Sequence, residues 1–190
     1  MDKRVADVIW TTARQQGTPD VVVEAVLGSL LPSIRLVAQQ PKTGEEERVG
    51  GCRIGGLPDL PQGVEWPRLS TYAQTDAPPV ALPGTPLSFL LQVNLTEIAF
   101  ADQEQLLPKS GMLYFFFDGG IGDDDVAAVL FTQGTQLRRA TVPPGLPADQ
   151  LYRGFNLVPN LEWTVSSPYD LGLSDHLELW DELEDRVAAA

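Results

Sequence analysis

In the segment LSFLLQVNL, residues 87–95, every odd-numbered residue is apolar, whereas three of the four residues between them are polar. Side chains two positions apart project from the same face of a β-strand. We therefore expect one wholly apolar face, made by Leu87, Phe89, Leu91, Val93 and Leu95. Gln92 and Asn94 then share the opposite face, which begins with Leu90. A strand of this kind predicts a sheet in the middle of the chain, packed on a core.

Two further strands follow in GMLYFFFD, residues 111–118, and VAAVLFT, residues 126–132. The first is apolar on both faces, which is typical of a strand in the centre of a sheet. The segment TQLRRATVP, residues 135–143, predicts another strand, paired to 126–132 through Gln133 and Gly134.

Weaker strand patterns lie on either side of this region. SIRLVAQ, residues 33–39, alternates apolar and polar residues, and FNLVPNLEWTVS, residues 155–166, is rich in β-formers. Because proline interrupts a hydrogen-bonded ladder, we expect a break at Pro159.

Helical periodicity marks the two ends of the chain. Residues 2–16 place Val5, Val8, Ile9 and Ala13 on one face, and Gly17 is a favourable stop. Thr18 is the expected N-cap of a second helix, with Pro19 at its first position.

The second helix is expected to bury Val22, Val23 and Val26, to run to about Leu31, and to end at Pro32. SDHLELWDELEDRVAAA, residues 174–190, predicts a last helix with Trp180, Leu183 and Val187 on one stripe.

The order of helices, then strands, then a helix predicts an α+β fold that is mainly β. It comprises two N-terminal helices, a largely antiparallel, roll-like sheet and one C-terminal helix. We expect a single domain over residues 1–190, divided into a helical part (1–32), a β-rich core (33–172) and the last helix (173–190).

Charge restricts the class of partner. The chain has 26 acidic and 13 basic side chains, a formal net charge of −13. Nucleic acids and anionic membranes require Lys and Arg to neutralise phosphates, so neither is expected as a partner. The same charge favours a protein partner with a basic face.

Cysteine content and the N-terminus indicate a compartment. Cys52 is the single cysteine, so no intrachain disulfide forms, which fits a reducing environment. The first residues lack a signal-peptide pattern, and no apolar run is long enough to span a bilayer. We expect a cytoplasmic protein.

Three motifs carry a resemblance to a known family. They are GGLPDLPQGVEWP at residues 55–67, QVNL at 92–95, and LPKSGMLYFFFD at 107–118. Their order and spacing resemble the YwqG-like family of bacterial proteins, whose function is unknown. The resemblance implies a mainly β, roll-like fold and a bacterial, cytoplasmic protein, and it supplies no catalytic residues.

One departure from the family pattern concerns the end of the chain. Family members often continue with another β-rich part that contains a histidine and an L-G-Y-P-type motif. This chain ends after one helix, so the resemblance implies either a natural short member or a truncated one.

Catalytic and metal chemistry find little support in the residue pattern. His176 is the single histidine, and Asp59, Glu65 and Asp118 have no spacing that sets a working carboxylate pair. Asp118 and Asp123–Asp125 lie close in sequence, but they do not match a calcium-loop pattern. We expect no metal and no cofactor.

The candidate binding residues are Trp66, Gln92, Asn94 and Asp118, for which we favour a structural role. We expect Gln92 and Asn94 to hydrogen-bond the irregular backbone of 55–67, and Trp66 to fill the core beneath it. The favoured function is a non-enzymatic protein-binding or scaffold module. The alternatives are a toxin-neutralising immunity protein and a carboxylate- or metal-dependent enzyme.

Overall fold

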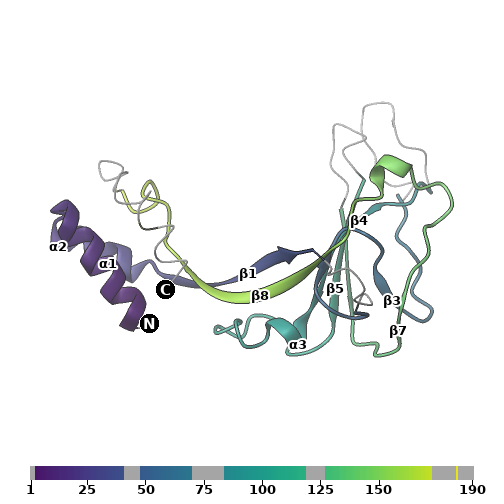
Figure 1. Ribbon diagram of the computed structural model, residues 1–190, viewed down its shortest axis with the longest axis horizontal. Coiled ribbons are helices and arrows are strands. Elements are labelled where there is room, and N and C mark those ends of the chain that lie inside the picture. Colours follow the sequence, from purple (N-terminus) through teal and green to yellow (C-terminus); the bar gives the residue numbers. More distant parts are fainter. Residues whose placement is uncertain (1–2, 41–47, 70–83, 119–126, 173–182, 184–190) are drawn as a thin grey trace. The chain divides into compact units, whose positions relative to one another are not determined.

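The computed structural model describes residues 3–40, 48–69, 84–118, 127–172 and Leu183 (Figure 1). The chain divides into two compact units. A helical unit comprises residues 1–35, 100–104 and 160–190, and a β unit comprises residues 36–99 and 105–159.

The helical unit contains the two predicted N-terminal helices, α1 (Lys3–Gln16) and α2 (Asp20–Gly28), which lie side by side (Figure 1). The two helices and Leu183 form a core. Its buried members are Val5, Ile9, Ala13, Val22, Val23, Val26 and Leu183. Of the predicted last helix, residues 173–190, only Leu183 is described, so Trp180 and Val187 lie outside the described residues. Among the described helices, none is long and apolar enough to cross a membrane.

The end of α1 is the glycine stop expected from the sequence. Gly17 has φ +68°, the Thr18 N–H donates to the Ala13 carbonyl at 2.9 Å, and the Gly17 N–H donates to the Arg14 carbonyl at 3.3 Å. These two bonds satisfy carbonyls of the last turn. The expected Thr18 cap is wrong, because Pro19 occupies the cap position of α2 and no side chain caps it.

The predicted end of α2 at Leu31 is also wrong. The helix ends at Gly28, where the Ser29 N–H and hydroxyl both donate to the Val26 carbonyl, at 3.0 and 2.9 Å. Leu31 already belongs to strand β1 (Leu31–Gln39), which contains Pro32. Since β1 is the first strand of its sheet, it has an edge on which a residue without an N–H is tolerated.

The main sheet has six strands in the order β1-β8-β2-β4-β5-β6. The other five strands are β2 (Arg53–Ile54), β4 (Ser88–Asn94), β5 (Met112–Phe117), β6 (Ala127–Thr132) and β8 (Phe155–Thr164). The registers from β8 through β2, β4 and β5 to β6 are antiparallel, which confirms the predicted largely antiparallel sheet. The fold is α+β with mostly strands.

Strand β8 runs through Pro159 without the expected break. The Leu157 N–H donates to the Cys52 carbonyl at 2.9 Å, so the nitrogen of Pro159, two residues on, faces the same side. Of the residues in β8, only Phe155 and Asn156 pair with β2. The proline therefore falls beyond the end of β2, where no ladder bond requires its N–H.

A separate two-stranded sheet joins β3 (Asp59–Pro61) to β7 (Leu137–Arg139). The expected hairpin between 126–132 and 135–143 is therefore wrong, because β7 pairs with β3 instead of β6. Leu137 and Ala140 pack against the core of the β unit, and Arg139 forms an ion pair with Asp59. Burial of the apolar side chains and formation of this ion pair favour β3 over the neighbouring strand β6 as the partner of β7.

A β-bulge in β4 sets which side chains face that core. Phe89 pairs with Phe116, Leu91 pairs with Phe115, and the register shifts between Phe89 and Leu91. One apolar face for the whole of 87–95 is therefore wrong: Leu87 and Phe89 face the core, whereas Leu91 and Val93 project from the opposite side. Gln92 and Asn94 share a face as expected, on the core side.

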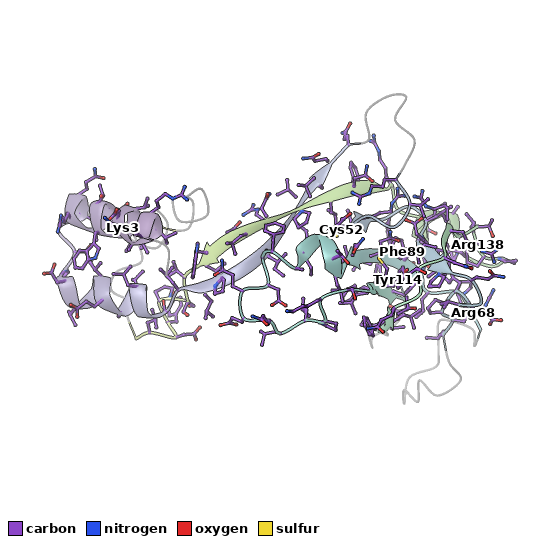
Figure 2. The ribbon with its side chains drawn as sticks, turned by 90° about the horizontal axis from the view of Figure 1, so that it is seen from below. Lys3, Cys52, Arg68, Phe89, Tyr114 and Arg138 are labelled. Carbon is purple, nitrogen blue, oxygen red and sulfur yellow. The ribbon has the colours of Figure 1, made fainter. Side chains whose placement is uncertain are left out.

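We name the two sides of β4–β6 by what packs on them. The inner face packs against β3, β7 and their neighbours, and its core comprises Leu60, Leu69, Leu87, Phe89, Met112, Tyr114 and Phe116, two of which Figure 2 labels. The outer face carries Leu91, Val93, Leu113, Phe115, Phe117, Ala127, Val129 and Phe131. As predicted, β5 has a strand on each side, but its outer-face side chains are only half-buried.

Gly55 accommodates the bulge. Its N–H donates at 2.8 Å to the carbonyl of Leu90, the bulged residue, and its φ is +65°. A Cβ at this position would collide with the carbonyl oxygen of Arg153. Glycine is therefore required here for two reasons, its left-handed backbone and the close approach of another chain segment.

We expect Gly55→Ala to destabilise the protein by about 3 kcal/mol, from backbone strain and the collision with Arg153. Gly63→Ala is the matched control, because Gly63 has φ +86° but no atom within 4 Å of its added Cβ. The control should cost only about 1 kcal/mol. Urea denaturation followed by circular dichroism measures both free energies of unfolding. Equal losses for the two variants would show that the contact with Arg153 does not contribute.

Candidate functional site

Gln92, on the inner face of β4, is fully buried, and both ends of its side-chain amide hydrogen-bond within the protein. Its Oε1 accepts the Asp59 N–H at 2.7 Å, and its Nε2 donates to the Gly51 carbonyl and to Asp59 Oδ2, both at 2.8 Å. The predicted bond from Gln92 to the backbone of 55–67 is confirmed. The side chain therefore ties β4 to the bend at Gly51 and to strand β3.

Asp59 is the centre of this polar cluster and is also fully buried. Its Oδ2 accepts the Gly50 N–H at 2.8 Å, in addition to Gln92, and its Oδ1 accepts Arg139 Nε at 2.5 Å. Its carbonyl accepts the Tyr114 hydroxyl at 2.6 Å. A buried carboxylate needs such compensation, and here three separate segments provide it.

From the residue pattern, Asp59 is only a weak candidate for carboxylate chemistry. In the structure, both of its carboxylate oxygens accept hydrogen bonds from the protein itself. A sequence signal was nevertheless present: an Asp between two prolines in the 55–67 motif is a charged residue in a segment of rigid, irregular backbone. We name the cluster of Asp59, Gln92, Tyr114 and Arg139 the clasp.

Asn94 extends the inner-face polar row but does not bond the 55–67 segment. Its Nδ2 donates to the Gly50 carbonyl at 2.7 Å, which corrects the prediction for this residue. Its Oδ1 accepts the Thr96 N–H at 2.9 Å and so caps α3 (Leu95–Ile98). Strand β4 thus ends in a helix cap, for which asparagine is a preferred residue.

Cys52 lies beside Asn94 and is buried. The Asn94 N–H donates to its Sγ at 3.2 Å, and the Cys52 N–H donates to Glu97 Oε2 at 3.0 Å. Glu97 in turn forms an ion pair with Arg48 at 2.8 Å. Burial, with a smaller contribution from the Glu97 carboxylate, raises the pKa of the Cys52 thiol to about 12. A thiol so disposed is protonated at neutral pH and is a poor nucleophile.

Trp66 and Asp118 lie toward the other end of the strands. Trp66 Nε1 donates to the Leu87 carbonyl at 2.7 Å, and its ring meets Phe116 edge-on with centroids 5.6 Å apart. Asp118 is buried, and its carbonyl accepts Gln150 Nε2 at 3.3 Å. Since Phe117 pairs with Ser88 and Tyr114 with Gln92, the four candidate residues do not converge on one site.

The other chemical candidates are equally dispersed. Glu65 is exposed, whereas His176 and Asp123–Asp125 lie outside the described residues. Within the described part of the chain, no three His, Cys, Asp or Glu side chains gather in a way that could hold a metal ion. The described polar residues of the clasp hold separate segments of the chain together.

The outer face of the sheet offers a different kind of surface. Exposure increases toward β6: Val93 is buried, Phe115 is half-buried, and Val129 and Phe131 are 58% and 49% exposed. Toward β8, Tyr152 stacks on Phe117 at 5.8 Å and so covers part of this face. We name the open part the β5–β6 patch, formed by Leu113, Phe115, Ala127, Val129 and Phe131.

Sequence reasoning missed this patch as a functional surface, although it predicted both strands. Strands β4, β5 and β6 contain no charged residue, and Phe131 pairs directly with Leu113, as Val129 does with Phe115. Contiguous apolar side chains on an exposed sheet face are typical of an interaction surface. The available signal was the apolar second face of 111–118.

Comparison with known proteins adds a family and no activity. A family model described as a domain of unknown function, DUF1963, matches residues 52–153. The matched region contains the clasp, the β5–β6 patch and the three motifs at 55–67, 92–95 and 107–118. No curated protein matches the chain.

We expect Gln92→Ala to lower the free energy of unfolding by about 3 kcal/mol, because it leaves the Asp59 N–H and the Gly51 carbonyl buried without partners. Asn94→Ala, at a partly exposed cap, should cost about 1 kcal/mol. The exposed Gln133→Ala is the control and should change little. Denaturant melts measure all three. An unchanged midpoint for Gln92→Ala together with loss of a partner or ligand would make Gln92 a binding residue instead of part of the clasp.

The raised pKa of Cys52 predicts how stability varies at high pH. The unfolded thiol loses its proton near pH 9, whereas the folded thiol keeps it to about pH 12. Stability is therefore retained below pH 9 and falls between these values, because the folded state binds more protons. Burial and Asp59 also raise the pKa of Tyr114, so the same fall continues at higher pH.

Cys52→Ala should flatten the fall in stability between pH 9 and 11 without removing it, as measured by thermal melts. The native thiol should also resist an aromatic disulfide reagent at pH 8 and react fully in urea. Rapid reaction of the native protein would contradict the assigned burial.

Proposed function

The chain belongs to the DUF1963 family, and from the geometry of the matched residues 52–153 we propose that it is a non-enzymatic protein-binding module. The observation that carries this proposal is the β5–β6 patch, an uncharged apolar surface on which Val129 and Phe131 are each about half exposed. Contacts of this kind bury apolar area when a partner docks.

The clasp supports a binding module over an enzyme. Asp59, the most buried of the described carboxylates, forms an ion pair with Arg139 and accepts a hydrogen bond from Gln92, so both of its oxygens are engaged within the protein. General acid or base work needs a carboxyl group that can exchange a proton with a bound molecule. The described polar residues instead make the sheet rigid, which is what a docking surface requires.

The partner we propose is a basic protein in the bacterial cytoplasm. The net charge of −13 supports the sign of the partner, since opposite charge accelerates encounter and excludes acidic competitors. The single cysteine and the YwqG-like motifs, all three within the matched region, support the compartment and the YwqG-like assignment.

The test is affinity capture from an extract of the source organism, with the tagged chain as bait. Phe131→Ser disrupts the patch, and Val142→Ser is the matched control, because Val142 is 46% exposed but lies outside the patch. We expect proteins retained by the wild type and by Val142→Ser to be depleted about tenfold with Phe131→Ser. Equal recovery with all three baits would contradict the proposal.

A further inference from the structure

Strand β6 presents hydrogen-bonding backbone groups on its open edge. The Leu95 N–H donates to the Gly111 carbonyl at 3.0 Å, one position beyond the pair Asn94–Met112. Because hydrogen-bonded pairs alternate in an antiparallel ladder, odd-numbered residues of β5 bond β4 and even-numbered ones bond β6. It follows that β6 bonds β5 through the residues paired with Met112, Tyr114 and Phe116.

Those paired residues are Thr132, Leu130 and Ala128. Ala127, Val129 and Phe131 therefore direct their N–H and C=O groups away from β5. In the part of the chain that the structure describes, no strand lies beyond β6. Three donors and three acceptors are thus aligned along a free edge, beside the β5–β6 patch.

Within the residues that the structure describes, this edge lacks the sequence features by which monomeric proteins protect such strands. β6 contains no lysine, no proline and no charged residue, and its register with β5 is continuous, without a bulge. Exposed edge strands are normally protected by one of these devices, because a bare edge templates pairing with another chain. The edge of β6 is therefore chemically suited to pair with a further strand.

We infer that β6 binds an extended segment of the basic partner as an additional strand; this rests on the proposed function and specifies the mode of binding. Ile54, Leu91, Phe115 and Val129 are paired in succession across β2, β4, β5 and β6. An apolar side chain opposite Val129 would continue this row on the outer face. The segment should therefore alternate apolar and polar residues.

Charge decides between the two classes of occupant. A second copy of the chain would also carry a net charge of −13, so two copies repel one another. A segment flanked by Lys or Arg is attracted to the same field, while its central residues meet the uncharged strands. The occupant is therefore a basic, extended segment of another protein and not a second copy.

The probe is a blocked peptide, acetyl-Lys-Lys-Thr-Val-Thr-Val-Thr-Lys-Lys-amide, titrated into the ¹⁵N-labelled full chain. In about 50 mM NaCl, where screening is weak, we expect amide shifts concentrated at Ala127, Val129 and Phe131. The same peptide flanked by glutamates should bind about tenfold more weakly. Equal binding of the two peptides, or no binding of either, would overturn the inference.

Val129→Pro tests the role of the edge. It removes an outward N–H but no bond to β5, so the variant should keep the native circular dichroism spectrum. Val129→Thr, which retains the N–H and the branched side chain, is the control. We expect affinity to fall about tenfold for the proline variant and to change little for the threonine variant. If the proline variant does not fold, a peptide N-methylated at its central residues is titrated into the wild-type chain instead. This peptide should bind about tenfold more weakly than the unmethylated one.

Two other outcomes would overturn the inference in different ways. A concentration-dependent dimer that Val129→Pro abolishes would make a second copy the occupant. Partner capture that is lost with Phe131→Ser but kept with Val129→Pro would leave the proposed function intact and exclude strand addition. If neither variant loses partner capture, both the proposed function and strand addition are contradicted.

Discussion

The buried carboxylate of Asp59 is the constraint on which the β unit depends. Strand β3 has only three ladder pairs with β7, which is too short a ladder to hold a second layer against the sheet by itself. Asp59 adds bonds to Gly50, Gln92 and Arg139, and its carbonyl adds one to Tyr114. Because removing any one partner would leave a buried charge or dipole unmatched, the layers are joined in one geometry.

The bulge at Leu90 complements this constraint. It allows Phe89 and Gln92 to face the same side of the sheet, although they are three positions apart. One apolar anchor and one polar anchor can therefore both reach the inner layer. The same shift directs Leu91 and Val93 outward, which supplies the beginning of the apolar outer face. The position of Gln92 in the clasp and the outward direction of Leu91 and Val93 thus both follow from one irregularity in β4.

Much of this architecture is predictable from residue patterns, and the exceptions have physical causes. The two N-terminal helices, the Gly17 stop and the strands at 87–95, 111–118 and 126–132 follow from periodicity. The bulge does not, because an extra residue inside an apolar run leaves no mark on composition. The pairing of β7 with β3 was also missed, since it depends on Arg139 meeting a carboxylate 80 residues away. Of the candidate site, Gln92 was placed correctly, while the central role of Asp59 emerged only from its contacts.

The pairing of β2 with β8 has a consequence for how the chain acquires its fold. Arg53 pairs with Gln92 on one side and with Asn156 on the other, so the second contact joins segments about a hundred residues apart. Such long-range closure is slow compared with the formation of neighbouring pairs. During synthesis the meander of β4, β5 and β6 can form as soon as it leaves the ribosome, whereas β2 waits for β8. In that interval the outer edge of β2 is unpaired, and the nascent chain depends on its acidic charge to remain unassociated.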